Sequence, residues 1–188
     1  MDIVFSLIFL AFFGYWIWRF MRAVTRRTTL VRRLRKICER RGHRLRRVRN
    51  PLASFFGAGA LPDVVISADD KEYCIRFVTS IDRGKFYYFA NEEYAVSYRK
   101  GAIALPFAKT ADVVTKNRKF HYFPPKIFPD FLEGKQGVTW ILLFNPAPAE
   151  IETINAAGTK HDIVGNGDMV GESVAYDGRT FCSLLVGE

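Results

Sequence analysis

The 188-residue sequence predicts a mixed α/β domain (an α+β mixed sheet) preceded by one transmembrane helix. Two observations support this. Residues 3–18 form an almost uninterrupted apolar run that leads directly into an arginine-rich segment. The chain that follows alternates β-prone runs with turn residues and has the length of one ordinary domain. We therefore divide the chain into a transmembrane helix (1–21), a basic juxtamembrane segment (22–28) and a single cytoplasmic domain (29–188).

The apolar run is suited to crossing a membrane once. A spanning helix needs about 20 mostly apolar residues, and residues 3–21 supply them if Arg19 extends to the headgroups. Tyr15, Trp16 and Trp18 occupy the position of an interfacial aromatic belt. No cationic segment precedes the run and no small-residue cleavage site follows it, which favours an uncleaved anchor over a signal peptide.

The distribution of charge predicts the orientation. Residues 19–49 contain 14 Lys/Arg and one acid, Glu39, whereas residues 50–188 contain 14 Lys/Arg and 17 Asp/Glu. The net charge of +9 therefore arises from a basic segment attached to a mildly acidic domain. The positive-inside rule predicts that the N-terminus lies outside and the domain in the cytoplasm. We therefore expect a single-pass protein of the cell membrane, and we expect a bacterial origin.

The domain is expected to begin with an amphipathic helix at residues 29–41. Its apolar positions recur with the helical period and are Leu30, Leu34, Ile37 and Cys38. Thr28 or Thr29 is a suitable N-cap, and Gly42 is a suitable residue to end the helix. The apolar stripe is expected to pack on the domain and leave the arginines exposed.

The basic segment is the first candidate binding site. The residues predicted to contact the bilayer and its anionic headgroups are Arg19, Arg22, Arg26, Arg27, Arg32, Arg33, Arg40 and Arg41. A nucleic-acid tether is a less favoured alternative, and it would use Arg32, Arg33, Arg40, Arg41, Arg44 and Arg46. An acidic protein partner is the third alternative. Aromatic residues do not interleave with the arginines, so stacking on single strands is not indicated.

The rest of the chain reads mainly as strands. They are predicted at residues 43–49, 62–67, 72–79, 85–90 and 94–98. The second and third are expected to form a hairpin around the turn at residues 68–71, and the last two to be antiparallel strands appended to the core. Residues 137–146 are apolar almost throughout, which is typical of a central strand covered on both faces. Residues 148–155 read as a short helix with Pro148 in its first turn, and residues 181–186 are expected to close the core.

The order of elements in residues 29–80 resembles the start of the PD-(D/E)xK nuclease fold, the restriction-endonuclease-like family. A helix that ends in glycine is followed by a strand, by a second strand opening with Pro62-Asp63, and by a longer apolar strand. The resemblance implies a restriction-endonuclease-like core. In that family an Asp opening the second strand and an acid-x-Lys on the third bind a divalent metal and activate water.

The second half of this motif is absent. Cys74-Ile75-Arg76 stands in register where the acid and the lysine are expected. Cysteine is a poor Mg²⁺ ligand, and arginine does not act as a base at neutral pH. Glu72 shares a strand face with Cys74, so Asp63 and Glu72 are the candidate ligands of a membrane-tethered, Mg²⁺-dependent nuclease. We expect instead a non-catalytic interaction or regulatory module without a cofactor.

Other motifs predict no site. Cys38, Cys74 and Cys182 are far apart in the sequence and favour neither a zinc site nor a disulfide framework; they read as buried apolar residues. The aromatic, proline-rich segment 120–131 fits an extended covering segment or a partner-binding loop. The glycines of segment 165–171 lack the context of a dinucleotide site, and Asn166-Gly167 reads as a tight turn.

Overall fold

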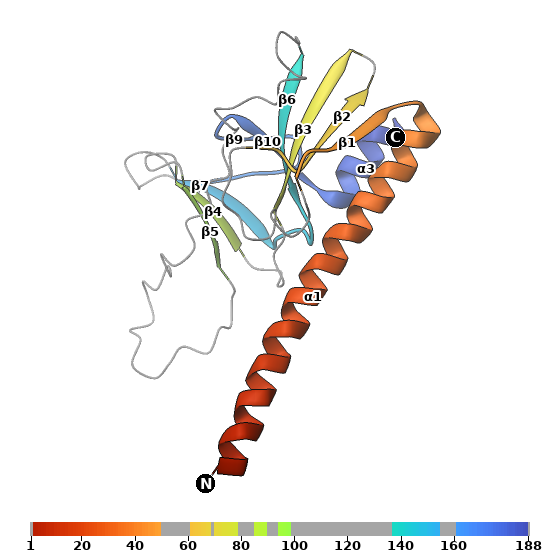
Figure 1. Ribbon diagram of the computed structural model, residues 1–188. Helices are drawn as coiled ribbons and strands as arrows, with labels where there is room; N and C mark the ends of the chain where they lie inside the picture. The colour runs from red at the N-terminus through yellow and green to blue at the C-terminus, as the bar shows by residue number, and fades with distance from the viewer. Residues whose placement is uncertain are drawn as a thin grey trace.

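The computed structural model describes residues 2–49, 61–68, 70–78, 85–89, 94–98, 137–154 and 161–187. Within these residues the chain forms two sheets and two helices, α1 (Asp2–Arg41) and α3 (Gly178–Val186) (Figure 1). The predicted mixed α/β class is confirmed. Predictions for residues 50–60, 99–136 and 155–160, including segment 120–131, lie outside the described residues.

The larger sheet mixes antiparallel and parallel pairs. Its described strands lie in the order β1 (Arg44–Arg47), β2 (Val64–Ala68), β3 (Lys71–Val78), β6 (Val138–Phe144), β10 (Ser173–Asp177) and β9 (Met169–Val170). β1, β2 and β3 pair antiparallel, and β6 is parallel to both β3 and β10. The predicted hairpin and the predicted central strand are therefore confirmed. The apolar run suits β6 because both of its faces are buried: Ile141 and Leu143 belong to one core cluster, and Leu142 and Phe144 belong to another.

The smaller sheet corrects one prediction. Its described strands lie in the order β5 (Tyr94–Tyr98), β4 (Lys85–Phe89), β7 (Glu150–Ile154) and β8 (His161–Ile163). The predicted helix at residues 148–155 is wrong, because this segment contains β7, which pairs with β4 and β8. Pairing on both sides satisfies the backbone of β7 and overrides the local helix signals, namely Pro148 and the acids.

The two helices cover one face of the larger sheet (Figure 1). The main core joins them to β2, β3 and β6, and its most deeply buried members include Leu34, Ile66, Ile75, Leu143 and Phe181. A second cluster contains Val78, Leu142, Phe144, Val164, Val170 and Ala175, with Ile151 of β7 packed against it. The three cysteines are free and buried, as the sequence predicts.

Helix α1 is one continuous helix of 40 residues and spans both predicted boundaries, after residue 21 and after residue 28. The predicted cap at Thr28 is wrong, because Thr28 lies inside the helix and its hydroxyl donates to the Val24 carbonyl at 2.8 Å. Gly42 does end the helix, with φ 74°, while the His43 N–H donates to the Cys38 carbonyl at 2.9 Å.

The first half of α1 projects away from the strands (Figure 1). The large apolar side chains between Val4 and Trp18 are 46–76% exposed, although they are the most apolar part of the chain. This half is long and apolar enough to cross a membrane, a property that it shares with signal sequences. The second half is buried on one side, beginning at Ala23, which is 1% exposed.

Helix α3 begins with an N-cap that the sequence analysis did not predict. The Asp177 carboxylate accepts hydrogen bonds from the N–H groups of Arg179 at 2.7 Å and Thr180 at 3.0 Å, and from the Asn166 amide at 2.8 Å. Burial acts to raise the pKa of Asp177, but the hydrogen bonds from Thr180, Arg179 and Asn166 outweigh it and lower the pKa.

We expect Asp177→Ala to cost about 1–2 kcal/mol of unfolding free energy, because an N-cap is lost. The exposed Glu172→Ala is the control and should stay within about 0.5 kcal/mol. Since the folded pKa is lowered, the stabilisation is present above the unfolded pKa and is lost as pH falls through the folded pKa. Denaturation titrations between neutral and acidic pH measure both effects; equal losses in the two variants would contradict the cap.

Candidate functional site

Asp63, the candidate metal ligand, is hydrogen-bonded through its backbone to β3 and to the two residues that follow β1. Its N–H donates to the Ile75 carbonyl at 2.9 Å, and its carbonyl accepts from the N–H groups of Val48 at 3.1 Å and Arg49 at 3.3 Å. The residue is only 3% exposed. Asp63 therefore sits at a fixed point where the chain after β1 meets the β2–β3 hairpin.

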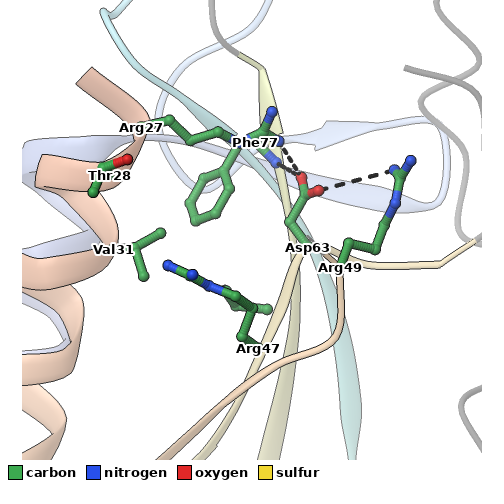
Figure 2. A pocket seen from close by; sticks show the side chains of 8 residues that line it. Arg27, Thr28, Val31, Arg47, Arg49, Asp63 and Phe77 are labelled. Carbon is green, nitrogen blue, oxygen red and sulfur yellow. Dashed lines mark hydrogen bonds and ion pairs between the residues drawn. The ribbon is translucent and has the colours of Figure 1, made fainter. Parts of the chain in front are cut away.

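The carboxylate of Asp63 is bound to α1 (Figure 2). Its Oδ2 accepts from Arg27 Nη2 at 2.6 Å and from the Phe77 N–H at 2.7 Å, while Arg49 Nη1 lies 3.9 Å from Oδ1. Arg27 is 7% exposed, and its guanidinium lies over the Phe77 ring at 5.2 Å. A buried ion pair thus joins the helix that carries the apolar half to the central hairpin.

The space around this ion pair is small. The cavity is about 10 Å³, which leaves room for about one water molecule. Its lining comes from α1, from the start of the hairpin and from the segment containing β1, and consists of Arg27, Thr28, Val31, Arg47, Arg49, Asp63, Val64 and Phe77. Pockets for metabolites usually measure about 300 Å³ or more. The cavity beside the Arg27–Asp63 ion pair is therefore too small to hold a metabolite.

Glu72, the second candidate ligand, lies elsewhere on the hairpin. It pairs with Ser67, whose hydroxyl donates to Glu72 Oε2 at 2.7 Å. It is five positions along β3 from Phe77, which contacts Asp63, and five positions correspond to roughly 16 Å along a strand. The structure therefore does not bring these carboxylates together. Among the described residues, no group of three or more His, Cys, Asp or Glu is placed to hold a metal ion.

Cys74 and Arg76, which stand where the acid and the lysine are expected, are both buried. Burial raises the pKa of Cys74 to about 12, with a smaller contribution from the charge of Glu72, so the thiol stays neutral near pH 7. A neutral thiol is neither a strong nucleophile nor a good ligand. Arg76 is also buried, at 8% exposure.

The candidate headgroup ligands on α1 differ in their exposure to solvent. Arg22, Arg32, Arg33, Arg40 and Arg41 are exposed and Arg26 is half-buried. The guanidinium of Arg22 lies 5.1 Å from the Trp18 ring, and Arg41 donates to the Val186 carbonyl. The Arg19 side chain lies outside the described part of the structure.

Arg27 requires a correction. We predicted that it faces lipid, but its ion pair with Asp63 buries it in the domain. The sequence contained a usable signal, because Arg27 lies three residues before Leu30 and seven before Leu34 and so continues their buried stripe. The missing information was the identity of the acid that neutralises it.

Comparisons with known proteins identified no relative of this chain. No family model, curated protein or solved structure matches the chain.

Proposed function

We propose that this is a single-pass protein of the cell membrane whose domain lies in the cytoplasm against the inner surface and acts as a non-catalytic interaction or regulatory module. The observation that carries the proposal is the continuity of α1. One helix supplies both an exposed apolar half and part of the domain core. Anchor and domain therefore share one rigid element.

The packing of α1 supports an uncleaved anchor. Ala23 and Arg27 are buried in the domain only five and nine residues after Trp18. Cleavage behind the apolar run would therefore cut within α1, immediately before the part of the helix that packs on the domain. The basic residues follow the run directly, which favours the cytoplasmic side for the domain.

The environment of Asp63 supports a non-catalytic module. The order α1, β1, β2, β3, with antiparallel pairing of the strands, agrees with the proposed restriction-endonuclease-like beginning. In this chain, however, Asp63 is engaged by Arg27 and the Phe77 N–H. A hard cation such as Mg²⁺ needs several oxygen ligands. To bind Asp63 Oδ2, it would have to compete with Arg27, which already donates a hydrogen bond to this oxygen.

The proposed orientation is tested with reporters fused after Glu188. A reporter that is active only in the cytoplasm should give a signal, and a reporter that is active only after export should not. Both fusions are compared at equal expression in membrane fractions. Activity of the exported reporter alone would reverse the proposed orientation.

The absence of nuclease activity is tested with the full chain in detergent. We expect no cleavage of plasmid DNA or RNA in Mg²⁺ or Mn²⁺ above a metal-free control. Because an Asp63 variant also loses its bond to Arg27, Glu72→Gln serves as the second variant. Metal-dependent cleavage by the wild-type protein that both Asp63→Asn and Glu72→Gln abolish would establish the nuclease alternative instead.

A further inference from the structure

Basic residues recur along one side of α1, beside its buried face. These residues are Arg22, Arg26, Arg33, Lys36 and Arg40. They follow one another at intervals of four, seven, three and four residues, which keeps them on one side of a helix. We call Arg22 and Arg26 the proximal pair, and Arg33, Lys36 and Arg40 the distal group. All three members of the distal group are exposed.

The continuity of α1 determines how far each residue stands from the bilayer. If the membrane ends near Met21, a rise of 1.5 Å per residue places Arg33 about 18 Å and Arg40 about 28 Å further along the helix. A tilt of 40° reduces these heights to about 14 and 22 Å. Charges are screened over about 8 Å at physiological salt. The proximal pair therefore lies within reach of the charge of the lipid headgroups, whereas the distal group lies beyond it.

The chemistry of the distal surface favours phosphates. Of the 14 cations in residues 19–49, all but Lys36 are arginines, and the only acid is Glu39. Arginine suits phosphate because its planar guanidinium donates two parallel hydrogen bonds. Between residues 22 and 49 no large apolar side chain is exposed. Protein interfaces usually depend on such apolar or aromatic anchors, so a protein partner fits this surface less well.

The same surface lacks the aromatic rings on which the bases of single strands stack. Residues 22–49 contain no Phe, Tyr or Trp, and single-strand binding relies on stacking against such rings. We propose that the distal group binds the phosphate backbone of a duplex nucleic acid, independently of sequence, and so holds it close to the inner membrane surface. This inference rests on the proposed cytoplasmic orientation and names the partner of the proposed module.

The test compares two variants that each remove two charges from one helix face. Arg33→Gln/Arg40→Gln alters the distal group, and Arg22→Gln/Arg26→Gln alters the proximal pair. The full chain is placed in nanodiscs of neutral lipid, and binding of labelled 20-base-pair DNA and RNA duplexes is measured by fluorescence anisotropy across salt concentrations. Circular dichroism checks that both variants remain folded.

We expect the distal variant to bind duplexes roughly 10- to 100-fold more weakly near 0.1 M salt. Its slope of log K against log salt should be shallower by about 1.8, because each lost phosphate contact removes about 0.9. The proximal variant should bind within about threefold of the wild-type protein, since its charges lie at the bilayer.

Three results would overturn the inference: no duplex binding by the wild-type protein, equal losses in the two variants, or binding of polyglutamate in place of duplexes. The last result would identify an acidic protein as the partner. Because orientation in the nanodisc is immaterial to this assay, its failure leaves the reporter result on topology intact. Conversely, a reversed topology would remove the cellular role while leaving the measured affinity unchanged.

Discussion

Replacing Arg27 by methionine should destabilise the domain by about 3–5 kcal/mol, because it removes the cation that lies 2.6 Å from the buried Asp63 carboxylate. Asp63 would keep the Phe77 N–H at 2.7 Å, but its nearest described cation would be Arg49 at 3.9 Å. The side chains of Arg27 and Asp63 are 8% and 4% exposed, so solvent is poorly placed to compensate. Methionine retains much of the packing against Phe77, which isolates the electrostatic loss.

Arg26→Met is the matched control, since Arg26 is the adjacent residue and is only half-buried. We expect it to change the unfolding free energy by about 0.5 kcal/mol or less. Pulse proteolysis of the full chain in nanodiscs across a urea series measures both variants. The double variant Arg27→Met/Asp63→Asn should recover part of the loss, because residue 63 then carries no negative charge to be compensated. Similar stabilities for Arg27→Met and Arg26→Met would contradict the buried ion pair.

Replacing Leu10 by arginine should release the protein from the membrane. A charge at the centre of a spanning helix costs about 2.5–3.5 kcal/mol on insertion scales, which is roughly a 100-fold change in an insertion equilibrium. Leu10 is 68% exposed in the described part of the structure. In a helix exposed to water, the same substitution would hardly change the free energy. The size of the effect therefore distinguishes a helix in the bilayer from a helix in water.

Leu184→Arg provides the comparison, because Leu184 is 45% exposed on α3, within the domain. Extraction of membranes with alkaline carbonate should leave the wild-type protein and Leu184→Arg in the pellet and release much of Leu10→Arg. Retention of Leu10→Arg in the pellet at the wild-type level would show that this half of α1 does not cross the hydrocarbon layer.

Most of the larger sheet was predictable from local patterns. β6 was identified by its apolar run and the β2–β3 hairpin by two apolar segments around a turn, and each pattern reflects burial that the strand itself must have. The end of α1 at Gly42 was predictable because a left-handed residue there favours glycine. The antiparallel pair β4 and β5 was also recognised, as strands appended to the core.

Elements whose state depends on distant neighbours were not predictable. β7 has helix-like local signals, but pairing with β4 and β8 makes it a strand. The sequence also suggested a new helix beginning near Thr28, whereas the buried stripe of α1 already starts at Ala23. The N-cap of α3 depends partly on Asn166, which is eleven residues away.

The sequence by itself determined the apolar segment, the basic stretch behind it and the strand pattern, because hydrophobicity, charge and periodicity are local properties. Only the tertiary structure decided the role of each charge. Arg27 and Arg33 are both arginines of one helix, yet Arg27 is neutralised by Asp63 from 36 residues away while Arg33 stays exposed. A buried charge needs its counterion, and the fold alone brings that counterion within reach.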